Sequence, residues 1–144
     1  MTLPQQIMWG SLFLGLCLIL HTLFLALCIG WLAKLADRLE NRNHMVRNLV
    51  LVLMALWVIV FAHTVQVWIW AAVWINYEVL SDWNEAIYFS MVTYTSLGYG
   101  DIVLGPGVRV FATFASVTGL LGFGLSTALL VALLNRLMIF LNED

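Results

Sequence analysis

Long apolar runs without a charged side chain constrain this chain more than any other feature. Asp, Glu, Lys and Arg are absent from residues 1–33, 48–77, 86–100 and 110–135. A hydrocarbon core of about 30 Å needs about 20 helical residues to span it, and all of these runs except the third can supply them. With 63% hydrophobic and 10% charged residues, the chain is predicted to be an all-α membrane protein with three spans.

The first run can form a helix from about Trp9 to Ala33. It is longer than the apolar part of a secretory signal and no positive charge precedes it, so we interpret it as a retained span. Trp9 and Trp31 would lie about 33 Å apart along this helix, near the two membrane interfaces. Cys17 and Cys28, about 16 Å apart, are too distant for a disulfide and are interpreted as small buried side chains.

Basic residues are concentrated between the first two predicted spans. Four of the six Lys and Arg side chains lie there: Lys34, Arg38, Arg42 and Arg47. The positive-inside rule makes this segment cytoplasmic, with the N-terminus outside and the C-terminus inside. The three arginines are expected in a loop, without the repeat on an apolar helix that a voltage sensor needs. We expect a multi-pass protein of a prokaryotic plasma (inner) membrane.

A short helix and a glycine-bearing loop are predicted between the second and last spans. The helix is expected from Trp83 to about Tyr94, with Asp82 as its N-cap and Glu85 completing a capping box. At about 18 Å, it would reach halfway through a membrane, and the chain must then return to the same side. Non-helical backbone at that depth is tolerated only when it is buried in protein or lines a polar path. The predicted order is span, span, re-entrant loop, span.

The loop after the short helix carries a specific motif. Its residues are Thr95, Ser96, Leu97, Gly98, Tyr99, Gly100 and Asp101. This motif resembles the signature of the potassium channel pore-domain family, and residues 119–128 are similar to that family's inner helix. The resemblance covers roughly half of the chain and excludes the first helix.

The resemblance implies two parts in the chain. Residues 1–47 would form an extra N-terminal helix with its basic loop, and residues 48–144 the ion-channel pore domain. Within the second part, the expected elements are an outer helix, a pore helix, a filter and an inner helix, at residues 48–77, 83–94, 95–101 and 108–141.

The motif suits the coordination of a potassium ion, which must exchange water for oxygen ligands at little net cost. Gly98 and Gly100 can adopt positive φ without a steric penalty, which lets neighbouring carbonyls share one direction. The resemblance makes residues 96–100 the K⁺ filter, with a Ser96 hydroxyl at its inner end and Tyr99 bracing the loop against the pore helix. Thr95 and Asp101 would support the filter and the outer mouth.

One filter segment cannot surround an ion, so the resemblance implies a homotetramer in membrane lipid. K⁺ would be the permeant ion, without a cofactor, a nucleic-acid partner or enzymatic activity. The positions that line the inner pore in the family match Leu120, Phe123, Thr127 and Val131, and its hinge glycine matches Gly119. For the four pore-lining positions, a stripe that only packs helix against helix is the alternative, because apolar periodicity cannot choose between them.

Several residues depart from the family pattern. Ser96 and Leu97 stand where Thr and a β-branched residue are usual, and Val92 stands where some members bury a Glu that pairs with the residue matching Asp101. A weakly selective cation channel and a non-conducting accessory subunit with the pore fold are therefore alternatives.

A glycine-rich surface turn is the alternative for the motif itself. A secondary transporter is disfavoured, because the chain shows neither inverted repeats nor paired broken helices.

His21 and His63 are expected near mid-membrane depth, where an ionisable group is a functional candidate. Thr22, Thr64 and Gln66 could satisfy two neutral imidazoles. A purely structural role and a proton-sensing role both stay open.

Overall fold

The computed structural model describes residues 1–141 and is entirely helical in its regular structure over that range. Its helices are α1 (Leu3–Arg38), α2 (His44–Asn76), α3 (Trp83–Tyr94) and α4 (Arg109–Leu141). Three of them, α1, α2 and α4, are long and apolar enough to cross a membrane. The predicted all-α fold with three spanning helices is confirmed.

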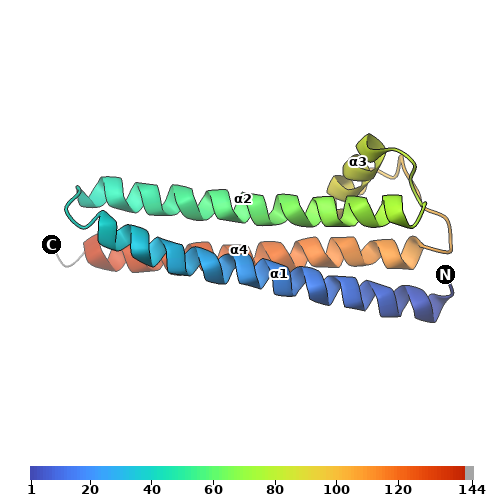
Figure 1. Ribbon diagram of the computed structural model, residues 1–144, viewed down its shortest axis with the longest axis horizontal. Helices are drawn as coiled ribbons and strands as arrows, with labels where there is room; N and C mark the ends of the chain where they lie inside the picture. The colour runs from blue at the N-terminus through green and yellow to red at the C-terminus, as the bar shows by residue number, and fades with distance from the viewer. Residues whose placement is uncertain (142–144) are drawn as a thin grey trace.

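The three long helices lie side by side along the length of the molecule, and α3 lies at one end beside α2 (Figure 1). The N-terminus is at the same end as α3. The C-terminal end of α4 and the α1–α2 turn are at the other end (Figure 1). The segment around α3 therefore leaves α2 and enters α4 at one end of the bundle.

The polar ends of two helices extend beyond their predicted limits. α1 begins six residues before the predicted Trp9 and continues past Ala33 to Arg38, and α2 begins at His44 rather than at residue 48. A basic side chain in the last turn of a helix interacts favourably with the carbonyl end, which favours continuing α1 to Arg38. The Asn43 side chain caps α2 by accepting a hydrogen bond from the Met45 amide at 2.8 Å.

The expectation that three arginines lie in a loop is therefore wrong for two of them. Arg38 is the last residue of α1 and Arg47 lies in the first turn of α2, while Arg42 lies in the turn between them. The lengths predicted for both helices from the charge-free runs were too short. Charged residues at a helix end do not interrupt a helix that projects beyond a membrane.

α3 has its predicted bounds, and its predicted N-cap is confirmed. The Asp82 carboxylate accepts hydrogen bonds from the amides of Asn84 and Glu85, at 2.9 and 3.2 Å. These amides have no partner inside the first turn of a helix, so the carboxylate satisfies them. The reciprocal Glu85 bond of a capping box is not among the hydrogen bonds of residues 1–141.

α1 packs against both α4 and α2, although it lies outside the family resemblance. The buried Gln6 side chain accepts hydrogen bonds from the α4 amides of Val110 and Phe111, at 3.0 and 3.3 Å. It thereby caps α4 from a different helix. One turn later, Gly10 lies under the Phe114 ring, where an added Cβ would overlap ring carbons. α1 is therefore an integral part of the bundle.

The buried apolar side chains form two clusters at different heights along the bundle. The larger one, near α3, includes Trp70, Trp74, Phe89 and Phe111. The smaller one, toward the other end, contains Cys28, Leu32, Leu51, Ala55 and Leu137. On α1, α2 and α4, the buried polar residues described below lie between these two clusters.

Candidate functional site

The C-terminal end of α3 leads directly into the predicted filter. The amide of Ser96 donates to the Thr93 carbonyl at 3.0 Å, and the amide of Leu97 donates to the Val92 carbonyl at 2.9 Å. This pair of bonds, with Ser96 in a left-handed conformation, is a Schellman ending of the helix. The first filter residue therefore also belongs to the C-terminal capping motif of α3, directly after the C-cap Thr95.

Backbone handedness alternates through the predicted filter. Ser96, Gly98 and Gly100 have φ of 59°, 58° and 78°, whereas Leu97 and Tyr99 are not among the residues with positive φ. The positive φ predicted for the two glycines is confirmed. Ser96 was not predicted to adopt it, because a residue with a Cβ pays a steric penalty there that glycine does not. Alternating handedness of this kind is what the predicted filter requires for its carbonyls to share one direction.

The whole loop from Thr95 to Asp101 is exposed in the single chain. Tyr99 is 68% exposed, so most of its ring has no partner within the chain, and the predicted brace against α3 is not made there. An added Cβ at Gly98 or Gly100 would meet no atom within 4 Å. Glycine is therefore favoured at these two positions by the backbone conformation and not by crowding within the subunit.

Asp101 is held at the end of the loop by α3. The Tyr88 hydroxyl donates a hydrogen bond to its carboxylate at 2.5 Å, and the Ile102 amide donates to the other carboxylate oxygen at 3.1 Å. The bond from Tyr88 lowers the pKa of Asp101 below its ordinary 3.8. Tyr88 is a partner of Asp101 that the sequence interpretation missed.

The four predicted pore-lining residues of α4, Leu120, Phe123, Thr127 and Val131, are all exposed in the single chain. Phe123 differs from the others, because its ring stacks on His63 of α2 with centroids 4.4 Å apart. Exposure is compatible with both a pore lining and a helix-packing stripe, so the pore-lining role stays a prediction.

Gly119 lies where α4 contacts the end of α3. An added Cβ there would overlap the Tyr94 carbonyl oxygen, and the Ser116 hydroxyl donates to the Thr93 carbonyl at 2.8 Å. α4 is an unbroken helix through this position. The close contact with Tyr94 thus explains why a residue without a side chain stands at position 119. The predicted hinge stays a prediction.

His21 and His63 meet in a hydrogen-bonded cluster that joins all four helices and is buried except at His63, which is half-buried. We call it the polar ring, and its members are His21, His63, Gln66, Tyr94 and Ser126. His21 contacts Gln66 and Ser126 at 2.6 and 3.0 Å, and His63 contacts Tyr94 and Ser126 at 2.8 and 3.1 Å. The Tyr94 hydroxyl donates to Gln66 Oε1 at 3.1 Å and closes the ring.

Of the three side chains expected to satisfy the histidines, only Gln66 does so. Thr22 and Thr64 donate instead to the carbonyls of Leu18 and Val60 in their own helices. The sequence interpretation missed Tyr94 and Ser126. Their hydroxyls in otherwise apolar helices were the available signal, because a buried hydroxyl in a membrane needs a partner.

The chain was compared with known protein families, curated proteins and solved structures. A family model described as "Ion channel" matches residues 49–136, which is more than half of the chain and runs from α2 through the loop into α4. No curated protein and no solved structure was found to match.

Proposed function

The chain belongs to the ion channel family, and on that premise we propose that it is one subunit of a potassium-selective channel that conducts K⁺ passively. The observation that carries this proposal is the alternation of φ in the exposed loop after α3, at Ser96, Gly98 and Gly100. A loop built in this way presents a column of carbonyl oxygens, which can replace the water around a K⁺ ion.

In this proposal, the carbonyls of residues 96–100 form the filter and the Ser96 hydroxyl adds an oxygen at its inner end. The carbonyl end of α3 directs partial negative charge toward an ion waiting below the filter. Asp101 raises the cation concentration at the outer mouth, since the Tyr88 hydrogen bond favours its ionised form. No bond is made or broken in this process, so the activity is transport.

Four copies are proposed to surround the axis. A single loop supplies one quarter of each oxygen ring, and closed rotational symmetry is the usual way to complete such a ring. The exposed Tyr99 supports this assembly, because a neighbouring subunit would cover its ring. Native mass measurement in detergent should give about four times the 16.2 kDa of one chain. A conducting dimer or pentamer would contradict the proposed symmetry.

The three apolar helices and the family together make this an integral membrane protein. We propose that α3 is re-entrant from the outer side and that the α1–α2 turn and the C-terminus are cytoplasmic, because Lys34, Arg38, Arg42 and Arg47 lie at that end. Membrane lipids would surround the assembled spans.

The reversal potential of the purified protein in vesicles tests potassium selectivity. With K⁺ on one side and Na⁺ on the other, we expect reversal close to the potassium equilibrium value, and block by barium, a divalent ion of similar size. Gly98→Ala should move the reversal toward zero, because the left-handed φ is strained for any residue with a Cβ. Gly105→Ala is the matched control, since an added Cβ there also meets open space but no positive φ is required.

Two alternatives would replace the proposal after specific results. Leu97, where the family usually has a β-branched residue, favours a weakly selective cation channel. Reversal near zero for the unmodified protein would establish that alternative. A tetramer that carries no current alone but does so beside a partner subunit would make the chain an accessory subunit.

A further inference from the structure

Neutral histidines satisfy every hydrogen bond of the polar ring. Gln66 and the two imidazoles each supply one hydrogen to the ring, and so do the hydroxyls of Tyr94 and Ser126. Five hydrogens therefore fill the five contacts. This count holds for either orientation of the Gln66 amide, which only sets the direction in which the donors point. A proton added to either histidine gives six hydrogens for five contacts, so one hydrogen must turn to an acceptor outside the ring or a contact must open.

Among the residues that the structure describes, no charged side chain is hydrogen-bonded to the ring. Within five residues of a ring member on its own helix, Cys17 is the one titratable group outside the ring, and α4 has none between residues 110 and 135. The charged residues of α1, α2 and α3, which are Lys34, Asp37, Arg38, Arg47 and Glu85, lie further along these helices. The two imidazoles themselves lie with their centroids 4.9 Å apart, so a charge on one disfavours a charge on the other. An unpaired buried charge is costly, and opening the ring to water is the available relief.

The ring acts on the filter through Tyr94. This residue ends α3, its hydroxyl belongs to the ring, and its carbonyl lies against Gly119. The first filter residue, Ser96, follows two positions later. On the other side, His63 stacks on Phe123, a predicted pore-lining residue. An open ring therefore frees the end of α3 and a side chain of the pore at once.

We propose that the polar ring positions the filter while both histidines are neutral and releases it when one is protonated, so that acid suppresses conduction from inside the protein. His21 and His63 are positioning residues, since they act through Tyr94 and do not touch the ion. The inference rests on the proposed channel function and adds a regulatory site to it.

The test is K⁺ flux from vesicles containing the full-length protein, with both faces buffered together from about pH 8 to about pH 4, which brackets the ordinary titration of histidine. We expect flux of the unmodified protein to fall about tenfold or more across this range. His21→Gln with His63→Gln removes both protonation sites but keeps a donor and an acceptor at each, and its flux ratio between low and high pH should approach one. His44→Gln removes the remaining, exposed histidine and should leave the acid response unchanged.

A second pair of variants separates positioning from folding. Tyr94→Phe and Ser126→Ala break the ring at every pH, so both should lower K⁺ flux at alkaline pH toward the level of the unmodified protein in acid. The midpoint of thermal unfolding in detergent should fall with acid in the unmodified protein but not in the double histidine variant, which reads out the ring without any ion flux.

The outcomes distinguish failure of the ring from failure of the channel. K⁺-selective flux that is independent of pH, or an acid response that survives the double histidine replacement, would overturn the ring proposal alone. Absence of K⁺ flux at every pH would overturn the proposed function. In that case, an unfolding midpoint independent of pH would overturn the ring as well.

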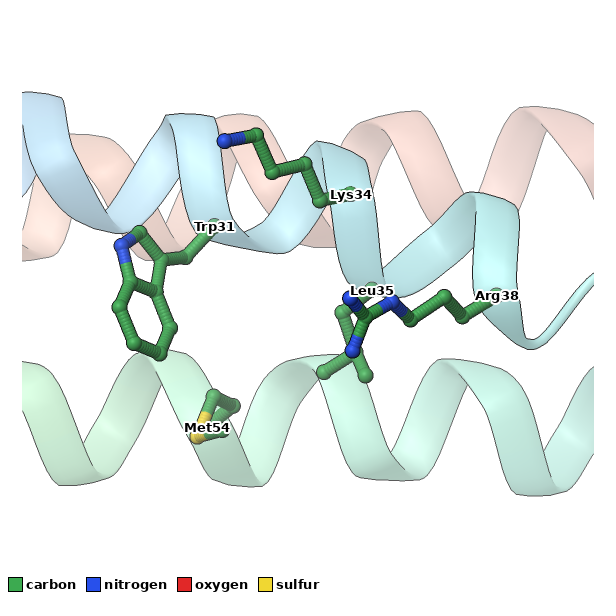
Figure 2. A pocket seen from close by; sticks show the side chains of 5 residues that line it. All are labelled: Trp31, Lys34, Leu35, Arg38 and Met54. Carbon is green, nitrogen blue, oxygen red and sulfur yellow. The ribbon is translucent and has the colours of Figure 1, made fainter.

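A different observation carries a second inference, at the other end of the bundle. A groove of about 390 Å³ lies between α1 and α2, lined by Trp31, Lys34, Leu35, Arg38 and Met54. Lys34 and Arg38 are one helical turn apart on α1. The Trp31 indole lies in the gap facing α2, Met54 faces it from α2, and the Arg38 guanidinium lies near Leu35 at the edge of α1 (Figure 2).

The groove combines an apolar slot with the Arg38 guanidinium at its edge, at the proposed cytoplasmic interface, and the Lys34 side chain extends along the side of α1 away from α2 (Figure 2). Trp31 is 69% exposed, as expected for an indole at a membrane surface. An acyl chain would lie against the apolar side chains, and a phosphate headgroup would pair with Arg38 and with Lys34 once the flexible lysine side chain rotates toward the groove. We infer that an anionic phospholipid of the cytoplasmic leaflet occupies this groove.

The midpoint of thermal unfolding in detergent tests this occupant when phosphatidylglycerol or phosphatidylcholine is added. Phosphatidylglycerol should raise the midpoint more, and Lys34→Gln with Arg38→Gln should remove that difference. Arg42→Gln, in the turn beyond α1, is the control and should keep the difference. An equal response to both lipids would contradict the inference, and so would an equal loss in the control. A change in oligomeric mass in the double variant would instead assign the groove to a neighbouring copy.

Discussion

Gly119 lies in close contact with the end of α3. Gly119→Ala places a methyl group on the Tyr94 carbonyl oxygen, which is backbone and cannot rotate away. We expect the replacement to lower the free energy of unfolding by about 1–3 kcal/mol, the usual cost of overpacking. Thermal unfolding in detergent measures it. Gly124→Ala adds the same methyl group on the same helix where no atom lies within 4 Å, and should leave stability unchanged or improve it.

The hydrogen bond between Tyr88 and Asp101 gives a prediction for pH dependence. This bond lowers the pKa of Asp101, so its contribution is present above the ordinary 3.8 and is lost as the pH falls through the lowered value. Tyr88→Phe should raise that pKa toward 3.8. Conductance in dilute salt should then begin to decline at a higher external pH than in the unmodified protein.

Tyr77→Phe provides the comparison for this measurement. It removes a hydroxyl at the same end of the molecule, but one that makes no hydrogen bond to Asp101. Its conductance profile should match that of the unmodified protein. If both variants shift the profile equally, the Tyr88 bond does not control the ionisation of Asp101.

Among the elements, α1 is the one whose role the sequence interpretation left open, and the Gln6 cap supplies a test of it. Gln6→Ala leaves the Val110 and Phe111 amides of α4 without their acceptor in a buried place. The expected loss is about 1–3 kcal/mol of unfolding free energy. Hydrogen exchange of these two amides should accelerate. Gln5→Ala, at the exposed neighbouring position, removes only a bond from the Thr2 amide within α1 and should affect neither α4 amide.

The existence and order of the helices could be predicted from the sequence, because each long span is marked by a charge-free apolar run and α3 by its Asp82 cap. The contacts between helices could not. The polar ring needs His21, Gln66 and Ser126 at matching heights on three helices, and apolar periodicity does not fix the axial position of one helix against another. In the loop, positive φ could be predicted at the two glycines from their residue type. At Ser96 it could not, because Ser96 adopts positive φ as part of the turn that follows α3.

Across the whole molecule, the topology predicts which ends are accessible from each side of the membrane. Asn43→Cys lies in the α1–α2 turn and should react with a membrane-impermeant thiol reagent only from the cytoplasmic side. Tyr77→Cys follows α2 at the opposite end and should react only from outside. The native Cys17 and Cys28 are 2% and 3% exposed, so they give little background. The reverse pattern of labelling would invert the proposed orientation.

The polar ring also imposes an order on biosynthesis. α1 is synthesised first, but the Ser126 partner of His21 lies 105 residues further along the chain. At about 5–20 residues per second, translation leaves α1 without that partner for on the order of ten seconds. During this interval the His21 imidazole must form this hydrogen bond with water or with the insertion machinery instead. The first helix is therefore committed to its final place only when the last helix arrives, and a chain truncated before Ser126 would expose an unsatisfied polar span to quality control.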